Sequence, residues 1–140
     1  MPGPVTARSS TSFRVDIEAG RHHLIADEPV DAGGTDEGPT PYDFLSAALA
    51  ACTSMTLHVV AKRENIPLQG LEMKVSNDRM YAKDCADCMN KSGYIHRFTV
   101  EIKINGEMTD AQRKRLQDVA TRCPVKKTLT SEIKIEAVFV

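Results

Sequence analysis

Four cysteines are the residues of this 140-residue chain best suited to chemistry, namely Cys52, Cys85, Cys88 and Cys123. A cysteine thiolate is a nucleophile and a metal ligand, and it can be oxidised to a sulfenic acid or a disulfide. The chain starts without an apolar signal segment, so we expect a cytoplasmic protein whose cysteines are thiols rather than a disulfide framework. Attention therefore turns to thiol reactivity and metal binding.

Cys52 occupies the middle of "AALAACTSMTLH", a stretch that is otherwise typical of a buried helix. Free cysteine often packs as a small hydrophobic side chain, which is one interpretation. The hydroxyl residues Thr53, Ser54 and Thr56 follow directly, and a helix that is apolar on most sides suits a subunit interface. A cleft at such an interface would expose the thiol, and this is the second interpretation.

Cys123 precedes Pro124, which we expect to end a helix, and it lies beside the cations Arg122, Lys126 and Lys127. Nearby cations lower the pKa of a thiol because they favour the thiolate. The C-terminus of a helix has the opposite effect. The residues alone therefore leave a structural and a redox role equally open for Cys123.

Cys85 and Cys88 form the "CADC" motif, whose spacing suits zinc ligands and redox pairs. Zinc would need two more ligands, and no pair of histidines has a suitable spacing. The motif lies in a polar turn rather than at the start of a helix. We interpret it as an exposed, oxidisable pair without an essential role, with a metal or redox role as the alternative.

The pattern of elements predicts a flexible arm at residues 1–12 and a single α+β domain at residues 13–140 with mainly antiparallel strands. Alternating apolar residues indicate strands, and apolar residues at helical spacing indicate helices. The predicted strands lie in a hairpin at 13–27 and at 71–75, 94–106 and 132–140, and the predicted helices lie at 41–63 and 109–123.

Both predicted helices begin at clear capping signals. Thr40 is a suitable N-cap with Pro41 and Asp43 in the first turn, and Thr109 and Gln112 have the spacing of a capping box. The first helix is apolar around well over half of its circumference, which in so small a chain predicts a dimer.

The charge and hydropathy of the chain argue against two classes of partner. Its 18 basic and 19 acidic residues give a net charge of -1 and are spread along the sequence, so we expect no nucleic-acid partner and no anionic membrane surface. The longest apolar stretch, residues 44–60, is interrupted by polar side chains, so we expect no membrane span.

Two segments together resemble the OsmC/Ohr family of osmotically inducible and organic hydroperoxide resistance proteins. They are "GPTPYDFLSAALAACTSMTL" and, further along, "RCPVKKTL". The segments "HLIADEP" and "DCADC" are similar to its OsmC-like branch. The resemblance implies an intertwined homodimer with a mostly antiparallel six-stranded sheet, a long buried central helix and active sites at the subunit interface.

The resemblance also implies an activity, the reduction of organic hydroperoxides in the response to oxidative stress. Cys52 would be the peroxidatic cysteine and Cys123 the resolving one, linked after turnover by a disulfide. An external dithiol such as a lipoyl protein would reduce that disulfide. No bound cofactor or metal is expected.

This sequence departs from the family pattern at the residues that support the thiolate. Peroxidases of the family carry a Glu ten residues before the peroxidatic cysteine and an Arg that pairs with it, whereas this chain has Tyr42 there, beside Asp43. Arg14 or Arg21 from the hairpin would have to supply the cation. Two alternatives follow, a non-catalytic module that binds a small ligand at the dimer interface, and a redox or metal sensor acting through Cys85 and Cys88.

Overall fold

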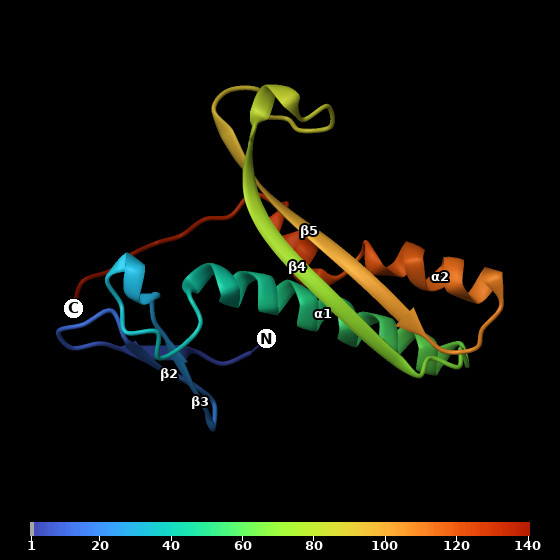
Figure 1. Ribbon diagram of the computed structural model, residues 1–140, viewed down its shortest axis with the longest axis horizontal. Helices are drawn as coiled ribbons and strands as arrows, with labels where there is room; N and C mark the ends of the chain where they lie inside the picture. Colours follow the sequence, from blue (N-terminus) through green and yellow to red (C-terminus); the bar gives the residue numbers. More distant parts are fainter. Residues whose placement is uncertain (1) are drawn as a thin grey trace. The chain divides into compact units, whose positions relative to one another are not determined.

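The computed structural model describes residues 2–140 (Figure 1). The chain forms two compact units, an N-terminal unit that ends at Leu45 and a C-terminal unit from Ser46 to Val140. The elements, in chain order, are β1 (Val5–Arg8), β2 (Val15–Ala19), β3 (His22–Ala26), the short helix η1 (Val30–Ala32), α1 (Pro41–Arg63), β4 (Gly70–Tyr81), η2 (Ala82–Asp84), β5 (Tyr94–Asn105), α2 (Asp110–Ala120) and α3 (Pro124–Leu129).

The N-terminal unit contains a three-stranded antiparallel sheet in the order β1-β2-β3. The predicted hairpin is confirmed as β2 and β3, with Ile17 opposite Leu24 and Gly20 at the turn with φ 61°. Within residues 1–12, where the sequence predicts a flexible arm, Val5–Arg8 form strand β1 and pair with β2. Val5 and Ala7 do alternate with Thr6 and Arg8, but four residues are too short a signal to predict a strand.

A buried carboxylate organises the loop after β3. Asp27 is 2% exposed and accepts hydrogen bonds from the backbone N–H of Glu28 at 2.7 Å, from Thr35 Oγ1 at 2.9 Å and from the backbone N–H of Glu37 at 3.1 Å. These bonds, that from Glu28 foremost, hold the pKa of Asp27 below its usual value although burial opposes them. The proline- and glycine-rich segment is therefore an ordered loop.

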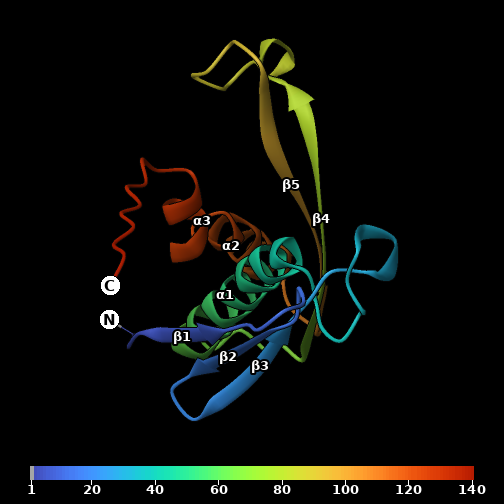
Figure 2. The ribbon, with the colours of Figure 1, turned by 90° about the vertical axis from the view of Figure 1, so that its left-hand side faces the viewer.

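The C-terminal unit contains a long antiparallel hairpin of β4 and β5, which pair from Gly70 opposite Asn105 to Tyr81 opposite Tyr94. One end packs on the helices, and the other end projects beyond both α1 and α2 (Figure 1, Figure 2). The hairpin is longer than predicted because the outer half of β4 is polar on both faces and gives no alternating signal. Cross-strand pairs hold that half, such as Arg97 Nη2 to Asp78 Oδ2 at 2.6 Å.

The helix α1 begins where the sequence predicts, since Asp43 N–H donates to Thr40 Oγ1 at 3.2 Å and Thr40 N–H donates to Asp43 Oδ2 at 3.0 Å. Its buried residues lie on one face and pack against α2. The core that they form contains Leu57, Val60 and Ala61 of α1, Ile66 after it, and Leu116 and Val119 of α2. The opposite face is open, with Met55 67% and Val59 61% exposed. Within the single chain the other elements cover only one face of α1, and burial of its other face in a dimer stays a prediction.

By length and composition alone, α1 would also suffice to cross a membrane, contrary to the expectation from its polar interruptions. A core helix passes the same test. In the structure α1 supplies core residues that pack on α2, as the core helix of a globular unit does.

The helix α2 confirms the predicted capping box. Gln112 N–H donates to Thr109 Oγ1 at 3.1 Å, and Thr109 N–H donates to Gln112 Oε1 at 3.0 Å. The helix ends at Ala120, before the predicted stop. Pro124 instead occupies the first turn of the unpredicted helix α3, where its missing N–H costs nothing.

The predicted strand at 132–140 joins no sheet within the described residues 2–140. Its apolar side chains are open to solvent, with Ile135 87% and Phe139 98% exposed. Residues 2–140 of the single chain thus contain five strands in two separate antiparallel sheets. The six-stranded sheet of an intertwined dimer stays a prediction. Alternation identifies a segment able to pair, but pairing also requires a free strand edge within reach.

Candidate functional site

The structure brings Cys52 and Cys123 together in the C-terminal unit. Cys52 lies on α1, Cys123 lies immediately before α3, and the Cys52 thiol is close enough to Cys123 to favour its thiolate. Both are free cysteines, Cys52 half-buried and Cys123 fully buried. A thiol that solvent reaches, that of Cys52, therefore lies next to the buried thiol of Cys123.

The surroundings of Cys123 favour its thiolate. Burial acts to raise the pKa of the Cys123 thiol, but donated hydrogen bonds outweigh burial and place this pKa below its usual value. Two hydrogen bonds reach the sulfur, from Thr53 Oγ1 at 3.5 Å and from the backbone N–H of Lys126 at 3.3 Å. The nearby Cys52 thiol and the backbone N–H of Val125 favour the thiolate as well.

Cys123 is the N-cap of α3, which corrects the sequence analysis. The sequence placed it at the C-terminus of the preceding helix, where the helix dipole would oppose a thiolate. At an N-cap the dipole and the free N–H groups favour negative charge. Lys126 acts on the sulfur through its backbone, since its ammonium donates to the Thr121 carbonyl at 3.0 Å.

Thr53 is a site residue whose role the sequence did not predict. Its hydroxyl donates to the Leu49 carbonyl at 2.8 Å and lies 3.5 Å from Cys123 Sγ. The sequence indicated Thr53 as one of the hydroxyl residues that follow Cys52, but its side chain contacts Cys123. A different hydroxyl, Thr56 Oγ1, donates to the Cys52 carbonyl at 2.8 Å. The spacing of Thr53, four residues from Leu49 on the buried face, is the signal that could have indicated this.

A pocket of about 590 Å³ lies beside the cysteine pair, also in the C-terminal unit. Of the residues that the structure describes, neither Cys52 nor Cys123 lines it, whereas Thr53 does. Most of the lining is apolar or small, with basic groups at Arg113 and Lys126. The lining residues are Leu49, Thr53, His96, Phe98, Val100, Ile102, Ile104, Arg113, Gln117, Ala120, Thr121, Lys126, Leu129 and Thr130.

An arginine–carboxylate pair does form in the N-terminal unit, but not at the family's position. Arg14 Nη1 donates to Glu37 Oε1 at 2.7 Å, and Arg14 Nη2 donates to Asp16 Oδ1 at 3.1 Å. Hydrogen bonds from Thr35 Oγ1 and then from Arg14 lower the pKa of Glu37, although burial opposes them. Glu37 lies in a loop rather than on α1, so no helical spacing indicates its role, and Asp43 serves the helix cap.

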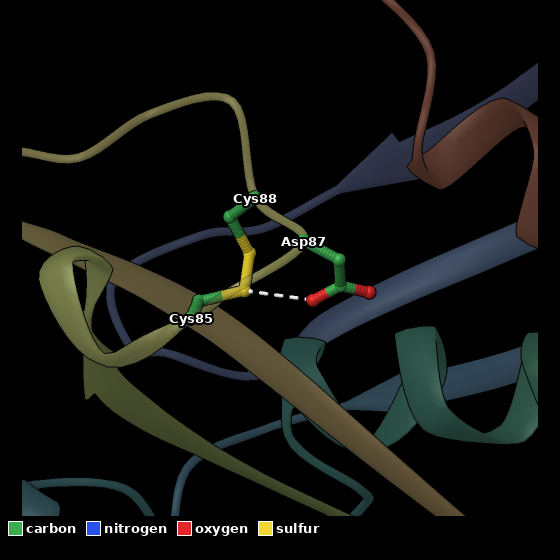
Figure 3. A group of neighbouring side chains, drawn as sticks. All are labelled: Cys85, Asp87 and Cys88. Carbon is green, nitrogen blue, oxygen red and sulfur yellow. Dashed lines mark hydrogen bonds between the residues drawn. A yellow bond between two sulfur atoms is a disulfide. The ribbon is translucent and has the colours of Figure 1, made fainter.

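Cys85 and Cys88 form a disulfide at the turn after η2, with their Cα atoms 5.4 Å apart (Figure 3). This corrects the expectation that the cysteines are thiols. Asp87 Oδ1 lies 3.3 Å from Cys85 Sγ, and these three residues are the one group of His, Cys, Asp and Glu side chains in residues 2–140 close enough to share a metal ion. Zinc would require both thiolates and at least one further ligand.

Comparison with known proteins places this fold. No curated protein matches the sequence significantly. Among solved structures, the OsmC-like protein of Mycoplasma pneumoniae is similar at 23% identity and a TM-score of 0.70, covering 90% of this chain and 85% of that chain. The organic hydroperoxide resistance protein OsmC of Legionella pneumophila is similar at 19% identity and a TM-score of 0.64, covering 91% and 88%.

The organic hydroperoxide resistance protein OhrB of Bacillus subtilis has 22% identity and a TM-score of 0.62, covering 91% of this chain and 89% of that chain. At these identities the likenesses show a shared α+β fold. The model of the OsmC-like protein family matches residues 34–138, which include both Cys52 and Cys123. This chain therefore belongs to the OsmC-like protein family.

Proposed function

We propose that this chain is a thiol peroxidase that reduces organic hydroperoxides, with Cys52 as the peroxidatic and Cys123 as the resolving cysteine. The observation that carries the proposal is that the half-buried Cys52 lies close to the buried Cys123, whose thiolate is favoured. The hydroperoxide resistance proteins among the similar structures support the same chemistry.

The proposed reaction starts at Cys52, the cysteine that solvent reaches. Cys52 loses its proton to water and, as a thiolate, attacks the terminal oxygen of the hydroperoxide. The O–O bond breaks, and the alkoxide takes a proton and leaves as the alcohol. Cys52 becomes a sulfenic acid.

Resolution forms the disulfide. Cys123 loses its proton and attacks Cys52 Sγ, the S–OH bond breaks, and hydroxide leaves as water. Thr53 and the N-terminus of α3 favour the attacking thiolate by hydrogen bonding. An external dithiol, such as a lipoyl protein, then reduces the disulfide by exchange and becomes a disulfide itself, so the cycle needs no bound cofactor.

The proposal includes a homodimer in the cytoplasm. The open face of α1, with Met55 and Val59, and the tail after α3 expose apolar side chains that a second copy would cover. A reducing compartment would return Cys52 and Cys123 to thiols between turnovers. Analytical ultracentrifugation tests the dimer: we expect a dimer for the natural chain and a monomer for Val59→Glu, and a monomeric natural chain would contradict it.

A second candidate function is the binding of a small apolar ligand without catalysis. The observation that favours it is the pocket of about 590 Å³, which Thr53 lines and the two cysteines do not. It predicts that the chain binds apolar probes and leaves hydroperoxides intact. Hydroperoxide turnover therefore separates the two candidates.

The experiment that tests the peroxidase is a disulfide map by mass spectrometry before and after addition of one equivalent of cumene hydroperoxide. We expect a Cys52–Cys123 bridge in the natural chain and none in Cys52→Ser. Ser54→Ala, a neighbouring hydroxyl variant, should still form the bridge. A Cys52 that stays reduced would overturn the proposal and favour the binding function.

A further inference from the structure

The disulfide between Cys85 and Cys88 (Figure 3) lies in the turn at the projecting end of the β4–β5 hairpin (Figure 1), and the two residues differ in exposure. Cys85 is 9% exposed, whereas Cys88 is half-buried. The peroxidase reaction above makes no use of either residue. An incoming thiolate therefore meets Cys88 before it meets Cys85.

The turn is held by contacts that do not need the disulfide. The Tyr81 and Tyr94 rings stack with centroids 4.7 Å apart, and Ala82 N–H donates to the Gly93 carbonyl at 2.8 Å. Lys91 Nζ donates to the Cys85 carbonyl at 2.6 Å. A disulfide that closes so short a loop also removes little entropy from the unfolded chain. Stabilisation of the fold is thus a weak account of the pair.

The third member of the cluster is a carboxylate beside the more enclosed sulfur. Asp87 Oδ1 lies 3.3 Å from Cys85 Sγ. When the pair is reduced, this distance lets the Cys85 thiol donate its proton to the carboxylate. A thiol with a proton acceptor at hand can become the thiolate that attacks a neighbouring mixed disulfide.

We propose that Cys85 and Cys88 form a second redox site, which exchanges electrons with external dithiols and disulfides. Cys88 is the sulfur that the external thiolate attacks, Cys85 is the enclosed sulfur that leaves and later returns, and Asp87 exchanges a proton with Cys85. The proposal does not depend on hydroperoxide reduction at Cys52.

A thiolate of the external dithiol bonds to Cys88 Sγ, the Cys85–Cys88 bond breaks, and its electron pair goes to Cys85, which takes a proton through Asp87. The second thiolate of the donor then attacks the donor sulfur in the mixed disulfide and releases Cys88. The donor is oxidised to a disulfide, and the protein gains two electrons and two protons.

The test uses the full chain with Cys52→Ser and Cys123→Ala, so that only this pair can react and failure of the peroxidase has no influence on the result. Circular dichroism verifies the fold. We expect dithiothreitol to reduce the pair in the folded protein and oxidised dithiothreitol to restore it. A pair that is reduced only after unfolding would overturn the proposal, because it would be a structural crosslink.

Single variants in the same background test the order of attack. Cys85→Ser leaves Cys88 as the one thiol and should react with Ellman's reagent at least about 10-fold faster than Cys88→Ser, which leaves Cys85. Equal rates or the reverse order would overturn the assignment of roles.

Asp87→Asn tests the proton exchange. With glutathione attached to Cys88, release of glutathione by Cys85 should be slower by several-fold in Asp87→Asn. The matched control is Asp84→Asn, which removes an acid of the same turn that is not part of the cluster. A slowing in both variants, or in neither, would overturn the role of Asp87.

Discussion

The two cysteine pairs of this chain are built in opposite ways. Cys52 and Cys123 come from distant parts of the sequence and meet because Thr53, which follows Cys52 on α1, contacts Cys123 at the N-cap of α3. Cys85 and Cys88 are three residues apart and meet because of a local turn at the end of a hairpin. The first pair consists of free thiols surrounded by hydrogen-bond donors, and the second is a disulfide beside a carboxylate.

Packing can thus place two thiols close together without a disulfide, whereas a local turn brings two cysteines within disulfide distance through its own backbone. The state of Cys52 and Cys123 should depend on the core that holds α1 and α3. The state of Cys85 and Cys88 should depend on the thiols available in solution. Changes to the core should therefore affect the first pair and leave the second unchanged.

The largest effect should come from Cys52→Ser. Hydroperoxide consumption should fall by at least roughly 1,000-fold, because the proposed nucleophile is lost. Met89→Ala, at a fully exposed position in the hairpin turn, should keep full activity. Peroxide consumption in the presence of a dithiol measures both variants. Equal activity of Cys52→Ser and the natural chain would mean that Cys52 is not the nucleophile, so its pair would not differ from Cys85 and Cys88 in reactivity toward peroxide.

Leu116→Ala should lower the free energy of unfolding by about 2–5 kcal/mol, because it opens a cavity where Leu116 is fully buried against α1. Met89→Ala should change it by less than about 0.5 kcal/mol. Urea denaturation followed by circular dichroism gives both values. A similar cost for both variants would mean that the turn contributes to stability as the core does.

Replacement of Cys85 and Cys88 together by alanine should cost at most about 2 kcal/mol, since the disulfide closes a short loop. The same urea titration measures it, with the natural chain under reducing and oxidising conditions as the reference. A cost above that of Leu116→Ala would show that the pair is a structural crosslink.

Thr53→Val should have the smallest effect and should act on Cys123. Loss of the hydroxyl removes a donor to the sulfur, so the pKa of Cys123 should rise and closure of the Cys52–Cys123 disulfide should slow about fivefold at neutral pH, the factor for one hydrogen bond of about 1 kcal/mol. Stopped-flow kinetics against pH measures this. Thr53→Ser keeps the hydroxyl and should behave as the natural chain.

The sign of the pH dependence follows from the lowered pKa of Cys123. Because the folded-state pKa lies below the ordinary value of 9.0, the thiolate stabilises the fold fully above that value, and this contribution is lost as the pH falls through the folded-state pKa. Thr53→Val should therefore be most destabilised, relative to the natural chain, at alkaline pH. A gap in stability that grows toward acidic pH would contradict the hydrogen-bonded thiolate.

Local signals predicted the elements that local interactions determine. The caps at Thr40 and Thr109 and the strand alternation around Ile17 are readable because each depends on neighbours within a few residues. The resemblance of two cysteine-centred segments to a known family indicated that Cys52 and Cys123 belong to one site, and the structure places them in contact.

Features that depend on distant partners were missed or misplaced. The outer half of β4 is polar on both faces and is held by β5, as in the pair of Asp78 and Arg97. Glu37 pairs with Arg14 across a loop. The sequence favours Pro124 as the end of a helix, although a proline suits the start of a helix equally well. Only the three-dimensional path of the chain shows that Pro124 starts α3.

The place of Cys123 before α3 has a consequence for backbone dynamics. Its sulfur accepts the N–H of Lys126, so the atom that would be oxidised also holds the first turn of a helix. A thiolate accepts a hydrogen bond more strongly than a sulfur that has formed a second covalent bond. Any covalent bond to this sulfur should thus loosen that turn and speed deuterium exchange at the amide of Lys126. The oxidation state of Cys123, a buried thiol without a spectroscopic signal, could then be followed by the exchange rate of one backbone amide.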